Sequence, residues 1–288
     1  MKIGLIDIDG KIPNLALMKI STYYKNKGNE VVLTNPLMAS IFDKIYASTV
    51  FSWSKIPALP KNAEIGGSGY DLQKKLPEEI DKLCPDYSLY PNVTYSIGFL
   101  TRGCIRNCPW CIVPKKEGKI KPYMDIEEFA RHDKIMLLDN NVLACDWGIK
   151  QIEKIARLNL KIDFCQGLDA RLITDKIAKL LSKVKWWKPV RLACDMASMK
   201  PIVQKAVELL RWHNVSPRTY VVYALITNDI EDSIDRIRFL KGLGVDVYAQ
   251  PYRDQEGTIP SQIQKDLARW VNHKAIFYSV DWGDYKKR

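Results

Sequence analysis

The sequence predicts an α/β protein, with a small N-terminal parallel α/β domain followed by a partial (β/α)6 TIM-like barrel. Short apolar runs alternate with segments of helical apolar spacing along most of the chain. Helices between successive strands imply right-handed crossovers and parallel sheets. A proline-containing stretch at residues 70–92 divides the alternation into two series. We therefore expect domains at residues 1–92 and 93–259, with a C-terminal helix and extension at 260–288.

The first series has the βαβ rhythm of a small parallel sheet. Strands are expected at residues 2–8, 31–33 and 43–48, and a helix at 14–27, where apolar residues recur at helical spacing. The Gly66-Gly67-Ser68-Gly69 segment that follows lacks the spacing of a P-loop or a dinucleotide fingerprint. We interpret it as a turn.

The second series predicts six strands with helices between them. The expected strands lie at 95–100, 134–138, 161–164, 190–194, 219–225 and 246–250, and the expected helices at 125–131, 147–158, 174–183, 198–212 and 230–242. Six such units in about 150 residues fit a partial or full barrel better than a flat sheet.

Length and composition are those of a globular protein. The 288 residues are 47% hydrophobic and 27% charged, and no apolar run is long enough to span a bilayer. The N-terminal apolar run is too short for a signal peptide, so we expect a cytoplasmic protein without membrane contact. Seven cysteines, three of them clustered, argue against a secreted disulfide scaffold.

The balance of charge favours an anionic partner such as RNA, because the formal net charge is +11. The alternative to an anionic partner is that the lysines only keep the surface hydrated, since no dense basic block stands out in the sequence.

Cys104, Cys108 and Cys111 carry the strongest chemical signal, with the spacing Cys-x3-Cys-x2-Cys. A closed structural zinc site needs four ligands, so three thiolates leave it incomplete. Three cysteines on a four-iron cluster would leave one iron open to an exogenous ligand. The loop follows the first strand of the second series, and sites form at the carboxyl ends of parallel strands.

This spacing, with the aromatic Trp110 before the third cysteine, resembles the hallmark of the radical S-adenosylmethionine (SAM) superfamily, and the resemblance covers most of residues 95–255. It implies that the three thiolates hold a [4Fe-4S] cluster whose fourth iron is chelated by SAM. It also implies a one-electron reductant of the flavodoxin or ferredoxin type. Reductive cleavage of SAM would then give a 5′-deoxyadenosyl radical that abstracts a substrate hydrogen.

The resemblance further implies SAM contacts at the ends of later strands. Asp139 is the best candidate for the SAM amino group, because a carboxylate accepts strongly from an ammonium. Arg171 is expected to pair with the methionine carboxylate, and Trp110 to lie against the adenine. The other expected cofactor or substrate contacts are Asn140, Asn141, Gln166, Asp169 and Asp195.

Residues 1–92 resemble a shortened cobalamin-binding α/β domain. That domain often carries Asp-x-His-x-x-Gly after its first strand, whereas this chain has Asp7-Ile8-Asp9-Gly10-Lys11-Ile12. Asp9 replaces the cobalt-ligating histidine, and Ile12 replaces the last glycine. We therefore expect no cobalamin and interpret the domain as a scaffold or a substrate cover.

Two alternatives stay open. The first is a zinc-dependent nucleic-acid-binding module without catalysis, whose fourth ligand would come from His132, His213, His273 or a distant cysteine. The second concerns the substrate of an enzyme, which is either a nucleic acid or a small molecule or peptide in the barrel mouth. An auxiliary cluster is not expected, because lone cysteines are usually small buried hydrophobes, and this applies to Cys145, Cys165 and Cys194.

Overall fold

A computed structural model of the chain describes residues 1–216 and 219–285. It shows a mixed α/β fold built on parallel sheets, which confirms the predicted class. Residues 286–288 of the predicted C-terminal extension lie outside the described residues. Within the described part of the chain, no helix has the length and apolar character needed to cross a membrane.

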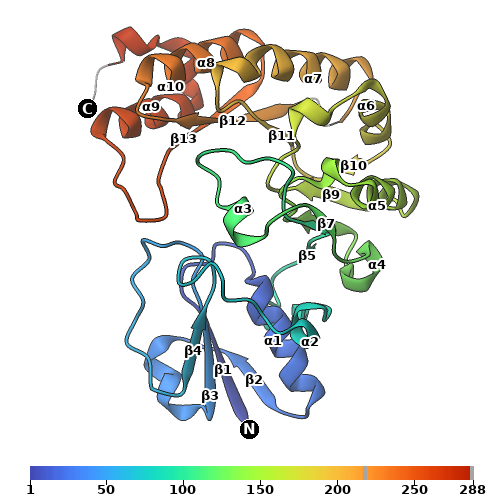
Figure 1. Cartoon of the computed structure of the whole chain (residues 1–288), viewed down its shortest axis with the longest axis vertical. Helices are drawn as coiled ribbons and strands as arrows, with labels where there is room; N and C mark the ends of the chain where they lie inside the picture. Colours follow the sequence, from blue (N-terminus) through green and yellow to red (C-terminus); the bar gives the residue numbers. More distant parts are fainter. Residues whose placement is uncertain (217–218, 286–288) are drawn as a thin grey trace.

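The N-terminal sheet has four parallel strands in the order β2-β1-β3-β4 (Figure 1). Their bounds are β1 Lys2–Asp7, β2 Glu30–Leu33, β3 Lys44–Ser48 and β4 Ala63–Gly66. Helix α1, Leu15–Asn26, joins β1 to β2, and the side chain of Asn14 caps it by accepting from the Leu17 amide. The chain leaves β1 in one direction for β2 and then crosses to the other side for β3. The carboxyl ends of β1 and β3 therefore form a topological switch point.

Residues 70–92 form a connector that packs against α1. It contains α2, Glu78–Asp81, and the 3-10 helix η2, Tyr87–Leu89. Leu17, Met18, Ile80 and Ile97 belong to one buried hydrophobic cluster. The core of the first series therefore continues into the first strand of the second.

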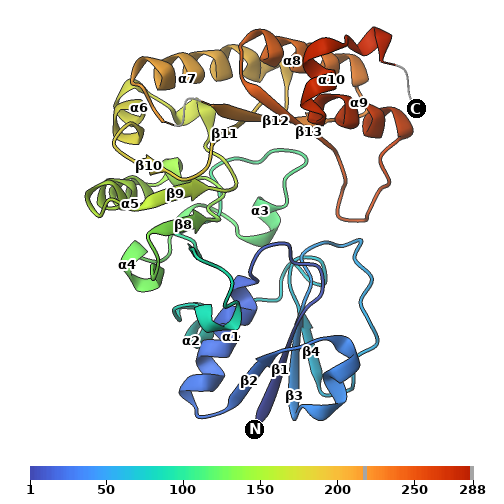
Figure 2. The ribbon, with the colours of Figure 1, turned by 180° about the vertical axis from the view of Figure 1, so that it is seen from behind.

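The central sheet is parallel with the order β10-β9-β8-β5. The upper sheet is parallel with the order β11-β12-β13 (Figure 2). The strands are β5 Ser96–Gly98, β8 Lys134–Leu137, β9 Lys161–Phe164, β10 Lys185–Trp186, β11 Val190–Ala193, β12 Tyr220–Ile226 and β13 Asp246–Pro251. All six predicted strands of the second series are therefore present, and β10 is an additional short strand.

The helices between these strands confirm the predicted alternation. They are α4 Ile126–Phe129, α5 Asp146–Arg157, α6 Asp175–Leu181, α7 Lys200–Trp212 and α8 Ile230–Gly242, followed by α9 Gln262–Asn272 and α10 Lys274–Ser279. The remaining 3-10 helices are η1 Pro36–Ile41, η3 Val142–Ala144, η4 Ala170–Leu172, η5 Ala197–Met199 and η6 Trp282–Asp284. Helix α4 is shorter than expected, because the chain turns to an extended conformation at Ala130.

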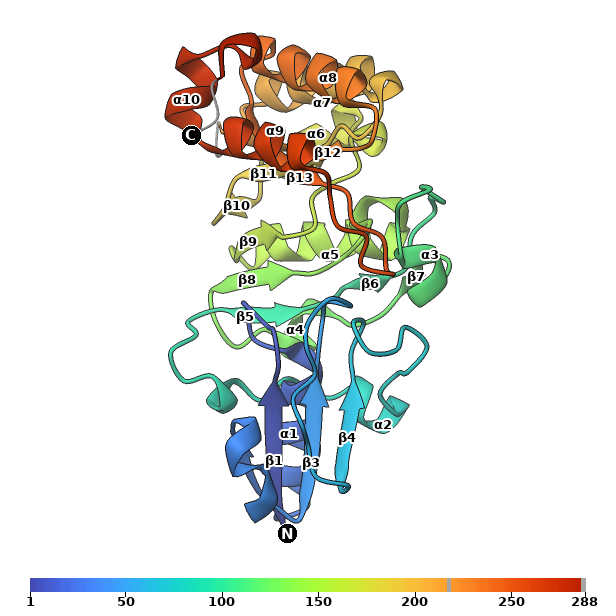
Figure 3. The ribbon, with the colours of Figure 1, turned by 90° about the vertical axis from the view of Figure 1, so that its left-hand side faces the viewer.

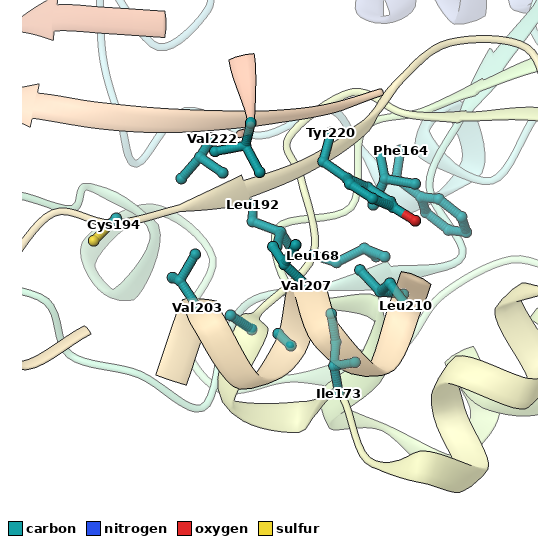
Figure 4. Close-up of a cluster of buried hydrophobic side chains, with 14 of the residues drawn as sticks. Phe164, Leu168, Ile173, Leu192, Cys194, Val203, Val207, Leu210, Tyr220 and Val222 are labelled. Atoms are coloured by element: carbon teal, nitrogen blue, oxygen red, sulfur yellow. The ribbon is translucent and has the colours of Figure 1, made fainter. Parts of the chain in front are cut away.

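The main core lies between the upper strands and their helices. Figure 4 shows Leu192 and Val222 from the strands facing Val203 and Val207 of α7. These four side chains are fully buried, and burying each contributes about 1.5–3 kcal/mol. The core therefore fixes the upper sheet and α7 as one unit.

The strands of the N-terminal sheet point toward the middle of the molecule. In Figure 3, β1, β3 and β4 run from the N terminus toward the segment that contains α3, Val113–Lys116, and the strands β6, Thr101–Arg102, and β7, Lys121–Pro122. The long loop after β13 descends toward the same region in Figures 1 and 2. Three parts of the chain therefore meet where β6 and β7 lie.

Candidate functional site

The three clustered cysteines lie in the loop of an antiparallel hairpin formed by β6 and β7, which the sequence pattern did not predict. The loop closes at Gly103, whose φ of 84° favours glycine. A Cβ at Gly103 would lie 2.3 Å from the Lys119 carbonyl oxygen. The Cys104 amide donates to the Gly118 carbonyl at 3.2 Å, and the Cys111 amide to the Cys108 carbonyl at 3.0 Å. These contacts bring the ends of the cysteine loop together.

All three cysteines are free, partly exposed thiols on the wall of one cavity of about 1660 Å³. Burial raises the pKa of Cys111, and the neighbouring thiols of Cys108 and Cys104 raise it further. Within the described ranges, no three histidine, cysteine or carboxylate side chains are arranged as a metal site. A shared cluster would therefore require these side chains to turn toward a common centre.

Asp169 links the cysteine loop to the loop that follows β9. Its carboxylate accepts from Arg106 Nε at 2.9 Å and from Arg171 Nε at 2.7 Å. Burial acts to raise the pKa of Asp169, but the bonds from Arg171 and Arg106 outweigh it, so the pKa lies below its ordinary value. The carboxylate therefore stays ionised between two guanidinium groups near neutral pH.

Asn141 is fully buried beside the cysteine loop. Its Nδ2 donates to Cys104 Sγ at 3.4 Å and to Asp169 Oδ2 at 3.1 Å. Its Oδ1 is a buried acceptor that meets no hydrogen-bond donor in the described chain. A buried polar atom without a partner costs about 1–3 kcal/mol, which a donor on a ligand would recover. This acceptor fits the ammonium group of SAM.

Asp139 lies beneath the cysteine loop, away from the cavity surface. It is 3% exposed, and its carboxylate accepts from the backbone amides of Leu100 and Thr101 and from the Thr101 hydroxyl. Burial raises the pKa of Asp139 to about 6 despite these bonds. Its contacts are to the segment that leads into the cysteine loop, so a direct ligand contact would need this segment to rearrange.

The other predicted residues line the cavity. Asn140 donates to Glu117 Oε2 at 3.0 Å, and Asp195 accepts from the Leu225 amide at 3.0 Å. Burial raises the pKa of Asp195. Gln166 and Arg171 complete the wall formed by the loop after β9. The predicted residues therefore converge on one cavity, with Asp139 in a supporting position.

Trp110 lies between this cavity and a smaller hollow of about 370 Å³. Tyr252 and Asn228 also line the hollow. One planar ring face and two polar groups suit a heteroaromatic ring such as adenine.

Three cavity-lining residues escaped the sequence analysis, namely Arg102, Arg106 and Glu117. Arg106 occupies a variable position of the cysteine motif, so spacing alone gives no sign of its bond to Asp169. Glu117 accepts from the Gly103 amide at 2.8 Å and pairs with Arg102 at 2.9 Å. These partners are 14 and 15 residues away in the chain, beyond the reach of local patterns.

The three histidines lie away from the cavity wall. His132 contacts Ser96 at 3.1 Å, and His213 contacts Asp175 at 2.6 Å. His273 stands between α9 and α10. Among the described residues, none of the three offers a fourth ligand beside the cysteine loop.

The scattered cysteines and tryptophans lie in separate surroundings. Cys165 and Cys194 belong to different hydrophobic clusters, and burial raises the pKa of Cys194 to about 11. Trp186 packs on Phe164, whereas Trp212 is 80% exposed.

No family model matches the chain, and no match to it is found among curated proteins.

Proposed function

We propose that this chain is a radical SAM enzyme with one [4Fe-4S] cluster held by Cys104, Cys108 and Cys111. The observation that carries the proposal is the convergence of the cysteine loop with Asn141 and Arg171 on one cavity. A thiolate motif, a buried acceptor and a guanidinium group are the three groups that a cluster and an amino acid moiety require.

The partial (β/α)6 barrel is part of the same proposal. The six expected parallel strands follow one another with intervening helices, and together with the short β10 they form two sheets. The Leu168 amide donates to the Arg191 carbonyl at 2.8 Å, which joins the loop after β9 to β11. This bond supports a continuous curved sheet whose carboxyl ends face the cavity.

When bound and reduced, such a cluster supplies the electron that cleaves SAM. The residues of the chain have positioning roles. Asn141 Oδ1 would accept from the SAM ammonium group, and the Arg171 guanidinium group, held in place by Asp169, would pair with the SAM carboxylate. Trp110 would provide a ring face for the adenine. Arg106 keeps the cysteine loop against Asp169.

The cellular setting follows from this chemistry. The enzyme needs a one-electron reductant of the flavodoxin or ferredoxin type. Seven free cysteines fit a reducing compartment such as the cytoplasm. The proposal does not include cobalamin, because Asp9 occupies the sequence position where a cobalt-ligating histidine would be expected.

Anaerobic reconstitution with iron and sulfide, followed by SAM and dithionite, tests the proposal. We expect a brown protein with about four irons per chain that releases 5′-deoxyadenosine. Cys108→Ala should lose both properties, whereas Cys84→Ala, in the connector, should retain them. A colourless protein that binds one zinc would support the binding module instead. A full cluster without 5′-deoxyadenosine would refute the enzyme.

A further inference from the structure

An aromatic platform, formed by Phe51 and Trp53, lines the same cavity as the cysteine loop. Phe51 and Trp53 stack with ring centroids 4.9 Å apart and an interplanar angle of 23°. The Arg253 guanidinium group, from the loop after β13, lies 5.0 Å from the Trp53 ring centroid. Trp53 is 47% exposed, and all three residues line the cavity that the cysteines share. Phe51 and Arg253 both contact the Trp53 ring, and a partly exposed group of aromatic rings and a guanidinium plane is suited to planar ligands.

The loop that carries the platform is held rigidly by Asp9. The Asp9 carboxylate accepts from the Val50 amide at 2.7 Å, the Phe51 amide at 2.9 Å and the Thr49 hydroxyl at 2.7 Å. Burial acts to raise the pKa of Asp9, but hydrogen bonds from Ser54, Val50 and Phe51 outweigh it and lower the pKa. The residue in the cobalt-ligand position therefore orders the aromatic loop.

The glycines after β4 support the same loop from the other side. A Cβ at Gly67 would lie 2.1 Å from the Thr49 carbonyl oxygen, and one at Gly69 would lie 2.4 Å from the Phe51 carbonyl oxygen. The Gly69 amide donates to the Thr49 carbonyl at 3.0 Å. Gly66 ends β4, and residues 67–69 form the predicted turn, whose role is close backbone packing.

Four of the eight lysines that line the cavity come from two neighbouring segments, and we call them the lysine rim. The lysine rim consists of Lys74, Lys75, Lys116 and Lys121. None of them pairs with a carboxylate in the described part of the chain, and a hydrogen bond of 3.2 Å from the Gln73 side chain to the Lys115 carbonyl joins their two segments. Arginines neutralise two nearby carboxylates, since Glu117 pairs with Arg102 and Asp169 with Arg106. Over the whole cavity wall, twelve Lys and Arg side chains stand against nine Asp and Glu side chains, so the formal charge of the wall is positive.

The cavity measures about 1660 Å³. A single small-molecule pocket occupies about 300–1,000 Å³, so this cavity has room for a nucleotide beside the proposed cluster and SAM. Sequence-tolerant binding of single-stranded nucleic acids combines a basic groove with aromatic rings on which bases stack. The platform and the lysine rim match this combination.

We propose that the substrate is a single-stranded nucleic acid, with a base stacked on Trp53 and phosphates along the lysine rim. The proposal rests on the proposed function for its catalytic role, because the platform and the three cysteines share a cavity. It places the stacked base in the same cavity as the cysteine loop.

Binding is tested first, without catalysis. Fluorescence anisotropy of a labelled single-stranded RNA of about 15 nucleotides is measured on the reconstituted holoprotein. Trp53→Ala should weaken binding about tenfold, the loss expected from one stacked base. Trp53→Phe should restore most of it, and Trp212→Ala, an exposed tryptophan outside the cavity, should leave it unchanged.

Salt dependence tests the rim. Lys74→Gln combined with Lys75→Gln should lower the slope of log affinity against log salt by about 1.4, since each contact to a single strand contributes about 0.7. Lys176→Gln with Lys179→Gln, on exposed positions of α6, is the matched control. The affinity for a single-stranded DNA of the same sequence shows whether binding depends on the ribose 2′-hydroxyl groups.

The outcomes separate the proposals. Affinity unchanged by both Trp53→Ala and the Lys74 and Lys75 pair would overturn the nucleic-acid assignment. Polyglutamate that displaces the RNA as well as unlabelled RNA does, together with no effect of Trp53→Ala on affinity, would indicate an acidic peptide as the substrate. This result would also overturn the nucleic-acid assignment. Release of 5′-deoxyadenosine without RNA is measured in parallel. If no 5′-deoxyadenosine is released but RNA binding still depends on Trp53, the proposed enzyme activity is refuted and the proposed RNA-binding site is supported.

Discussion

Asn141 donates a hydrogen bond to the sulfur of Cys104, with Nδ2 and Sγ 3.4 Å apart. The same nitrogen donates to Asp169, so one amide connects the loop after β8 with the cysteine loop and the loop after β9. The amide oxygen is left as a buried acceptor. This arrangement fixes a buried acceptor beside a proposed cluster ligand.

Asn141→Ala should weaken SAM binding while the cluster is retained. The variant removes one acceptor for the SAM ammonium group, and a hydrogen bond to a charged group contributes about 1.5–3 kcal/mol. We expect a rise in the KM for SAM of about tenfold or more, measured by 5′-deoxyadenosine release at matched iron content. Asn62→Ala, whose amide contacts Phe42 and Asp43 in the N-terminal domain, should leave the KM unchanged. An unchanged KM in Asn141→Ala would contradict the role.

Asp169→Asn should loosen the cysteine loop. The substitution removes the negative charge between Arg106 and Arg171, and the carboxylate side chain is only 5% exposed. We expect the cluster to be lost to a chelator about tenfold faster, as for the loss of one charged hydrogen bond. Loss of the charge-transfer absorbance measures the rate. Asp235→Asn, which breaks an exposed pair with Lys200, is the control. Equal rates in wild type and Asp169→Asn would show that the clamp does not hold the loop.

Asp139 should make the folded state less stable as pH rises from about 4 to about 6. Its pKa is raised to about 6 by burial, so the folded state binds more protons than the unfolded state in this window. The unfolding free energy falls by about 3 kcal/mol over this window, and the decrease levels off above the pKa of the folded state. Asp139→Asn removes this titration, although it also weakens the bonds to Leu100 and Thr101.

Urea unfolding of wild type and Asp139→Asn across this pH range measures the effect. The difference between their unfolding free energies should change by about 3 kcal/mol in favour of the variant as pH rises. A constant difference would mean that Asp139 has an ordinary pKa in the folded protein.

The strands and the convergence of the site could be predicted because both depend on local patterns. Apolar runs define β8 and β9, and polar residues directly after them must lie at one sheet edge. Asn141 and Asp169 follow from that rule. The depth of Asp139 could not be predicted, because it depends on which of three consecutive polar residues faces Leu100 and Thr101.

The aromatic platform could not be predicted from the sequence either. Trp53 and Arg253 are 200 residues apart in the chain, and they meet only because the N-terminal sheet and the loop after β13 face the same cavity. Asp9 illustrates the same limit. The sequence shows that an aspartate replaces the cobalt-ligating histidine. The hydrogen bonds of Asp9 to Val50 and Phe51 could not be predicted, because they depend on the pairing of β1 with β3.

Lys19 should make the protein more stable as pH rises from about 8 to about 10. The side chain is 3% exposed, and it contacts the Tyr123 hydroxyl at 2.7 Å and Asp81 Oδ1 at 3.6 Å. Burial lowers the pKa of Lys19 to about 8, although Asp81 acts to raise it. In this window the unfolded state binds more protons than the folded state, so the unfolding free energy increases with pH by about 3 kcal/mol.

Lys19→Met keeps the length of the side chain and removes the titration. Wild type should therefore gain about 3 kcal/mol relative to the variant over this window, measured by urea unfolding. Lys25→Met, on the exposed side of the same helix and paired with Asp86, should show no such gain. Burial also raises the pKa of Tyr123, so the tyrosine stays protonated over the range and does not mask the effect. A pH-independent difference between wild type and Lys19→Met would mean that the amine is hydrated, and that α1 and the Tyr123 segment are not packed tightly around it.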